Sequence, residues 1–226
     1  MDLLPWLTAL THLQEVAELS ALVIFIMTPK AGRKNFLIIG VMLAFIVVIE
    51  LGSWIAHDVF HVNPNVINHA YNLFIVPAFY FFYVDKIHSD RIKNRFLLLT
   101  ITFLLFASIN MIFFQGLTSV SSYTMAFRCV ILIIFSSIYF GVLATELPRQ
   151  VYVGLPIFWI NCAVVTYFSI LLPIHLFTDY IYLTLKLSII PLWMVHNFVG
   201  VVYYSFVSVG LWRNRSLYTL QSSLHA

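Results

Sequence analysis

Charged residues are scarce in this chain of 226 residues. Asp, Glu, Lys and Arg together make up 9% of it, while hydrophobic residues make up 62%. A soluble domain carries about 25% charged residues. Because a water-soluble fold of this size could not hide so much apolar surface, the composition predicts a membrane protein. The polar connections are all short, so we expect one membrane domain over residues 1–226.

Cysteine is nearly absent, and both copies, Cys129 and Cys162, fall within apolar runs. This argues against a disulfide framework and against a zinc ribbon. The N-terminal segment MDLLPWLTAL lacks the basic region of a signal peptide, so we expect it to belong to the fold. The net charge of +3 calls for no nucleic-acid partner, because its distribution along the chain has a simpler cause.

Apolar runs of about twenty residues recur along the whole chain, and each is long enough to cross the hydrocarbon core as a helix. Short alternating segments, which transmembrane strands would need, do not occur. The first run is the weakest, because Glu15 and Glu18 interrupt it. The predicted fold is an all-α bundle of seven transmembrane helices. The spans are 4–27, 36–56, 66–84, 96–114, 123–143, 151–176 and 180–207.

Basic residues are missing from every second connection between these spans. The segments HDVFHVNPN and QGLTSVSS, and the turn around Thr178, contain neither Lys nor Arg. The positive-inside rule therefore predicts the N-terminus outside and the C-terminus in the cytoplasm. The basic residues of the other connections and the tail are Lys30, Arg33, Lys34, Lys86, Arg91, Lys93, Arg95, Arg149, Arg213 and Arg215.

Four isolated charges lie inside the predicted spans, and an ionisable group in a bilayer marks a candidate functional site. Lys186 is expected about seven residues inside the last span, which is roughly 10 Å deep. The other three charges, with two asparagines, are expected at similar depths, so we predict one polar layer in the outer half of the membrane. Its members are Glu18, Glu50, Asn72, Asn110, Arg128 and Lys186. Two interpretations stay open: structural ion pairs that fix helix register, or an outward-opening ligand pocket.

Two further sites are alternatives. His57, Asp58 and His61 are candidate metal ligands, because the two histidines would share a face if the second span continued as a helix. Pro64 argues that the helix ends there, and interfacial histidines that bind nothing are the competing interpretation. A lysine in the last of seven helices also suggests retinal bound to Lys186 as a Schiff base. However, the third span lacks the arginine and paired threonines of microbial rhodopsins.

Two stretches, HAYNLFIVPAFYFFYVDK and LPIFWINCAVVTYFSILLPI, are similar to segments of small seven-helix membrane proteins of Bacteroidetes-type bacteria. The likeness covers about the middle two-thirds of the chain and consists of diffuse aromatic-rich patterns. It implies the seven-helix fold and a location in a bacterial inner membrane. It implies no activity.

These observations favour a ligand-sensing or signal-relay module in the lipid bilayer that binds a small molecule and works with a separate cytoplasmic or membrane partner protein. A small-solute or proton-coupled transporter that uses the same charges is the rival hypothesis. A retinal protein is a further alternative. A membrane-embedded enzyme ranks below the sensor and the transporter, because no nucleophile–base pair or metal motif stands out.

The predicted orientation is testable with two fusions. A reporter fused after Ala226 should be cytoplasmic, and a tag inserted into HDVFHVNPN should be accessible from outside, because the basic connections face the cytoplasm. Protease protection in spheroplasts measures both. Labelling from the opposite side at either position would overturn the orientation.

Overall fold

The computed structural model describes residues 3–61, 63, 65–186 and 188–224, with the side chains of 57, 58, 149, 150, 183 and 218–224 excepted. Within these residues all regular structure is helical, and no strand occurs. Two of the elements are single π-helical turns (η) that prolong an α-helix. The elements are α1 (Leu4–Met27), α2 (Lys30–Asn35), α3 (Leu37–Asp58), α4 (Asn65–Val84), α5 (Asp90–Ile109), η1 (Asn110–Phe114), α6 (Ser122–Glu146), α7 (Arg149–Tyr152), α8 (Pro156–Asp179), η2 (Tyr180–Thr184) and α9 (Ile190–Leu224).

Six helical segments of the described chain are long and apolar enough to cross a membrane. Their lengths, between 20 and 28 residues, match the thickness of a hydrocarbon core. A chain with this many apolar helices is a multi-pass membrane protein. The segments are Leu4–Met27, Leu37–Ala56, Asp90–Phe114, Ser122–Glu146, Pro156–Tyr182 and Ile190–Leu217.

The remaining long helix, α4, corresponds to the predicted third span but is more polar than the others. Its 20 residues begin with Asn65, Asn68, His69 and Asn72 in the first half. This polar half is the reason why α4 is not among the six apolar segments. His69 and Asn72 are nevertheless buried, so part of this polarity faces protein.

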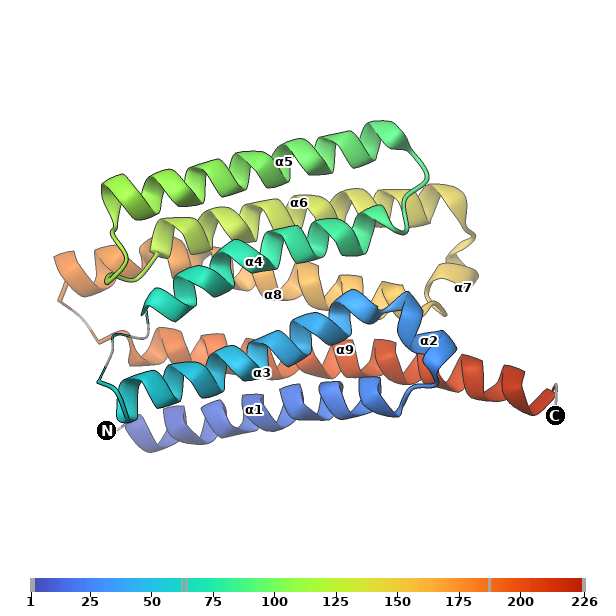
Figure 1. The fold of residues 1–226 in the computed structure, drawn as a ribbon, viewed down its shortest axis with the longest axis horizontal. Coiled ribbons are helices and arrows are strands. Elements are labelled where there is room, and N and C mark those ends of the chain that lie inside the picture. Colours follow the sequence, from blue (N-terminus) through green and yellow to red (C-terminus); the bar gives the residue numbers. More distant parts are fainter. Residues whose placement is uncertain (1–2, 62, 64, 187, 225–226) are drawn as a thin grey trace.

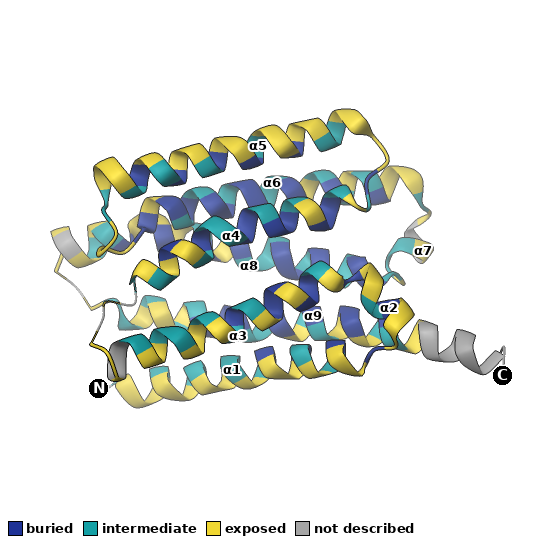
Figure 2. Ribbon diagram, in the orientation of Figure 1, coloured by how far each residue is buried: buried dark blue, intermediate teal, exposed yellow. Residues whose placement is uncertain are grey.

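The long helices run side by side in alternating directions, and the two chain ends lie at opposite ends of the bundle (Figure 1). Helix α8 packs between α6 and α9, while α4 contacts α3, α5 and α6. Figure 2 shows buried residues facing the interior, whereas α1 and α5 keep broad exposed faces. Those exposed faces are largely apolar, as expected for surfaces in contact with lipid chains.

Aromatic side chains fill the interior between the end of α4, the start of α5 and the middle of α6. The rings of Phe96 and Phe135 stack with centroids 4.2 Å apart, and Tyr83 contacts both at right angles. The Tyr83 hydroxyl donates a hydrogen bond to Asn161 Oδ1, which also accepts one from Ser136 Oγ at 2.9 Å. This half of the bundle is therefore closely packed, with its buried polar groups paired.

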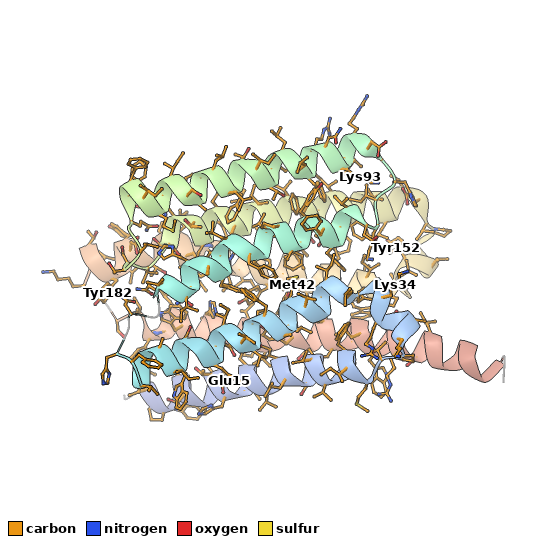
Figure 3. The ribbon with its side chains drawn as sticks, viewed as in Figure 1. Glu15, Lys34, Met42, Lys93, Tyr152 and Tyr182 are labelled. Carbon is orange, nitrogen blue, oxygen red and sulfur yellow. The ribbon has the colours of Figure 1, made fainter. Side chains whose placement is uncertain are left out.

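Apart from Arg128 and Lys186, the basic residues of the described connections lie at one end of the bundle. Figure 3 shows Lys34 and Lys93 toward that end and Tyr182 toward the other. Two hydrogen bonds tie the basic connections together: Lys86 Nζ donates to the Asn35 carbonyl at 2.9 Å, and Asn214 Nδ2 donates to the Gly32 carbonyl at 3.0 Å. We call this the basic end. It contains the connections that the charge pattern assigns to one side of the membrane.

The predicted last span, 180–207, begins too early. Residues Tyr180–Thr184 continue α8 as a π-helical turn, and α9 starts at Ile190. Lys186 lies between them with a positive φ of 51°, a conformation that ends a helix. Ser188 Oγ then accepts a hydrogen bond from the Ile190 amide at 3.3 Å at the start of α9. The expected turn around Thr178 is thus wrong, and the connection near residues 185–189 replaces it.

Gly210 permits the close approach of α8 and α9. A Cβ atom at this position would come within 2.8 Å of both the Pro156 carbonyl oxygen and Ile160 Cγ1. Gly210→Ala is therefore expected to destabilise the protein by about 1–3 kcal/mol, because the helix backbones would have to separate. Thermal unfolding in detergent measures the change.

Gly141→Ala in α6 is the matched control, since no atom lies within 4 Å of the added Cβ. It should leave the melting temperature unchanged or raise it slightly, because alanine is the better helix former. Equal melting temperatures for Gly210→Ala and the control would contradict the close packing of α8 on α9.

Candidate functional site

A cavity of about 280 Å³ lies between the helices, in the part of the bundle away from the basic end. It reaches from the start of α4 and of α6 toward the middle of the bundle, and six helices line it. Its wall combines polar and aromatic side chains with a few aliphatic ones. The lining residues are Gln14, Ile46, Ile49, Glu50, Asn65, Asn68, Tyr71, Asn72, Ser119, Val120, Ser121, Met125, Arg128, Tyr167, His175, Trp193, His196 and Tyr204.

Arg128 of α6 carries the buried positive charge of this cavity. Its residue surface is only 4% exposed, and its guanidinium lies over the rings of Tyr71 and Phe168, at 5.4 and 5.8 Å from the centroids. The Nη1 group donates a hydrogen bond to Asn72 Oδ1, whereas Nε has no hydrogen-bond partner. Cation–π contacts and one amide therefore hold the cation.

Asn72 of α4 positions this arginine. Its Oδ1 accepts from Arg128, and its Nδ2 donates to Ser121 Oγ at 2.8 Å. The three residues come from α4, from the segment before α6 and from α6 itself. Because the amide supplies one acceptor and one donor, it links all three parts through a single side chain.

Two histidines line the same cavity from α8 and α9. His175 is 2% exposed, and its ring centroid lies 5.9 Å from that of His196. His175 Nε2 and His196 Nδ1 are buried without a hydrogen-bond partner. Trp193 and Tyr167 flank the His196 ring at 5.1 and 6.1 Å. The sequence did not single out these residues as a site. For Trp193 and His196 one cause is the predicted start of the last span at residue 180, ten residues before α9 begins.

The negative charges come from α1 and α3. The Glu50 residue is exposed, and it lines the cavity. Glu18 is 1% exposed, and both carboxylate oxygens lie buried outside hydrogen-bond geometry. The Glu50 carboxylate and the Tyr204 hydroxyl are among the groups near this carboxylate. Glu18 thus lies beside the cavity wall rather than in it.

Asn110 lies elsewhere. Its Nδ2 donates to Gln115 Oε1 at 2.7 Å and to Thr124 Oγ1 at 3.0 Å, which ties η1 to the start of α6. It also lines a separate, mostly apolar groove between α5, α6 and α8. Asn110 therefore does not line the cavity that contains Arg128.

Lys186 is the largest departure from the predicted layer. It lies in the exposed connection between η2 and α9, outside any helix, and does not line the cavity. The prediction that it lies deep in the last span is wrong, because the apolar stretch after Asp179 belongs partly to α8. Retinal on Lys186 was suggested because the lysine was predicted to lie inside the last transmembrane helix. The structure does not place it in a helix.

The candidate metal ligands near the end of α3 do not share a helix. That helix ends at Asp58, and His61 lies beyond it, exposed, with a φ of 53°. The side chains of His57 and Asp58 lie outside the described residues. In the rest of the chain, as far as the structure describes it, no group of three His, Cys, Asp or Glu side chains is arranged to hold a metal ion.

No family model, no curated protein and no solved structure matches the chain. The predicted resemblance to small bacterial seven-helix proteins stays a prediction. The cavity and its charges are therefore the basis for inferring a function.

The positions of Lys186 and Asn72 predict opposite effects on stability. Lys186→Met should leave the melting temperature unchanged, because the side chain is exposed. Asn72→Leu should destabilise the protein by about 1–3 kcal/mol, because it removes the acceptor of the buried Arg128 and the donor to Ser121. Thermal unfolding of both variants in one detergent is the measurement. If Lys186→Met lowered the melting temperature as much as Asn72→Leu does, this placement of the lysine would be contradicted.

Proposed function

We propose that this protein is a membrane sensor or signal-relay module that binds a small molecule in the cavity around Arg128. The observation that carries the proposal is the buried guanidinium, whose Nε has no partner and which has no carboxylate within 4 Å among the described residues. An arginine in the interior of a membrane protein is costly unless its donors are satisfied. A ligand that accepts hydrogen bonds from the guanidinium would supply the acceptor that the protein does not provide for Nε.

We infer seven membrane crossings, with α4 as the additional one. Its polar half contributes Asn65, Asn68, Tyr71 and Asn72 to the cavity, so these residues need not meet lipid. The chain ends at opposite ends of the bundle support an odd number of crossings (Figure 1). The basic end supports a cytoplasmic C-terminus and an external N-terminus. In the bacterial inner membrane that we propose for this protein, the cavity would then lie in the outer half.

The packed half of the bundle favours sensing over transport. Between the cavity and the basic end lie Phe79, Tyr83, Phe96 and Phe135, each at most 1% exposed. A solute would have to pass through this aromatic core to reach the other side. Binding at the cavity requires no such rearrangement.

Helix α9 offers a route for a signal. It lines the cavity through Trp193, His196 and Tyr204, then continues without interruption to the basic end, where Asn214 bonds the Gly32 carbonyl. A shift of α9 on ligand binding would therefore move the basic end directly. A separate partner protein would detect that movement there.

Proton-coupled transport of a small solute is the second candidate function, and Glu18 is the observation that favours it. The carboxylate is buried, has no cationic partner in the described part of the chain, and lies near Glu50. A buried carboxylate that binds and releases a proton is what such a transporter needs.

Small molecules that co-purify with the protein test the binding function. Wild type and Arg128→Gln, extracted from membranes under the same mild conditions, are compared by mass spectrometry of the released metabolites. We expect at least one small molecule enriched in the wild type and lost from Arg128→Gln. Gly141→Ala, far from the cavity, is the control that should keep it.

Identical metabolite contents for wild type and a folded Arg128→Gln protein would overturn the binding proposal. Uptake of the enriched molecule into proteoliposomes that hold only this protein, driven by a proton gradient, would favour transport. Binding without uptake would favour the sensor.

A further inference from the structure

The cavity has a positive wall and a negative wall that do not neutralise each other. Arg128 of α6 and Glu50 of α3 both line it, yet no ion pair joins them in the described residues. Tyr71 of α4 lines the same cavity, and the Arg128 guanidinium lies 5.4 Å from its ring centroid. The two opposite charges are thus held apart within a single cavity.

The positive wall has several unsatisfied nitrogens. Arg128 Nε, His175 Nε2 and His196 Nδ1 are all buried without a partner, and the three residues line the same cavity. Both imidazoles lie within electrostatic reach of Arg128. An imidazole nitrogen donates or accepts according to its tautomer, so this wall offers charged and neutral donors to one anionic group.

The negative wall combines charge with aromatic surface. Glu50 is accessible from the cavity, and Glu18 lies behind it, close enough for the two carboxylates to repel each other. Tyr204 lines the cavity beside Glu18. Carboxylates with an aromatic ring nearby form the environment that an ammonium group prefers.

A ligand with only one charge would leave one wall uncompensated. An anion at Arg128 would face Glu50 in the same cavity, and a cation at Glu50 would leave the Arg128 Nε unpaired. The Glu50 carboxylate would repel the anion, and the cation would leave the buried Arg128 without a counter-charge, which is costly. A molecule that carries both charges satisfies both walls at once.

We propose that the ligand is a small zwitterion of the amino-acid type, with its carboxylate at Arg128 and its ammonium group at Glu50. This inference rests on the proposed binding function and adds the chemical class of the ligand. The volume of about 280 Å³ lies at the small end of ligand pockets, which fits a molecule of this size.

Titration of the purified full-length protein with chain-matched probes tests the proposal. The zwitterions are glycine, β-alanine, γ-aminobutyrate, δ-aminovalerate and L-leucine. Each is compared with the carboxylate and the amine that lack the second charge, such as butyrate and n-butylamine, and with inorganic phosphate. Calorimetry measures the dissociation constants. At least one zwitterion should bind about tenfold tighter than both of its single-charge analogues, because each analogue loses one charge-assisted contact.

The variants assign the two ends of the ligand. In Glu50→Gln the zwitterion should lose its advantage over the carboxylate, and in Arg128→Gln it should lose its advantage over the amine. Lys186→Gln, outside the cavity, is the control and should bind as the wild type does. If a cavity variant fails to fold, the comparison of ligands on the wild-type protein still tests the proposal.

Equal affinity for the zwitterion and its carboxylate, or binding of phosphate alone, would overturn the zwitterion and leave an anion site. Failure of all these probes to bind the wild type would also overturn the inference. A metabolite that co-purifies with the wild type and is lost from Arg128→Gln would still support the binding function in either case. The zwitterion proposal can therefore be overturned while the proposed binding function is still supported.

Discussion

Burial of Arg128 is the constraint on which this part of the structure depends. A guanidinium among apolar helices must find its partners within the protein, because lipid offers none. Asn72 accepts one of its hydrogen bonds, and the rings of Tyr71 and Phe168 cover its faces. Asn72 and Tyr71 both come from the polar first half of α4, where His69 and Asn72 are buried against protein.

The two halves of the bundle differ in whether their buried polar groups have hydrogen-bond partners. Toward the basic end, Tyr83, Asn161 and Ser136 satisfy one another inside a closely packed aromatic core. Toward the other end, polar atoms of the arginine and of two histidines remain without partners around a cavity. A bundle built only for stability would pair these groups or replace them, since an unpaired buried polar atom lowers the free energy of unfolding. The unpaired half is therefore where a ligand is expected, and the packed half is where the helices are held in register.

Much of the helical architecture was predictable from the chain alone, because apolar runs of about twenty residues have few alternatives to a helix in lipid. Six of the seven predicted spans correspond to helices that are long and apolar enough to cross a membrane. The prediction for span 4–27 coincides with α1, although Glu15 and Glu18 interrupt it. The error at the last connection has a local cause. Tyr180–Thr184 is equally apolar whether it ends one helix or begins the next, and only packing placed it on α8.

The sequence by itself determined the membrane class, the helical segments and the gathering of basic residues, since these follow from composition and order along the chain. It also singled out Glu50, Asn72 and Arg128, because a polar residue in an apolar run is visible without a structure. Only the tertiary structure decided which of these residues share a cavity. The cavity is also lined by residues that the sequence did not single out, whereas Lys186 and Asn110 do not line it. The additional residues are His175, His196, Trp193 and Tyr204. The physical reason is that depth along a helix follows from residue spacing, whereas the direction in which a side chain points depends on how neighbouring helices are rotated and packed.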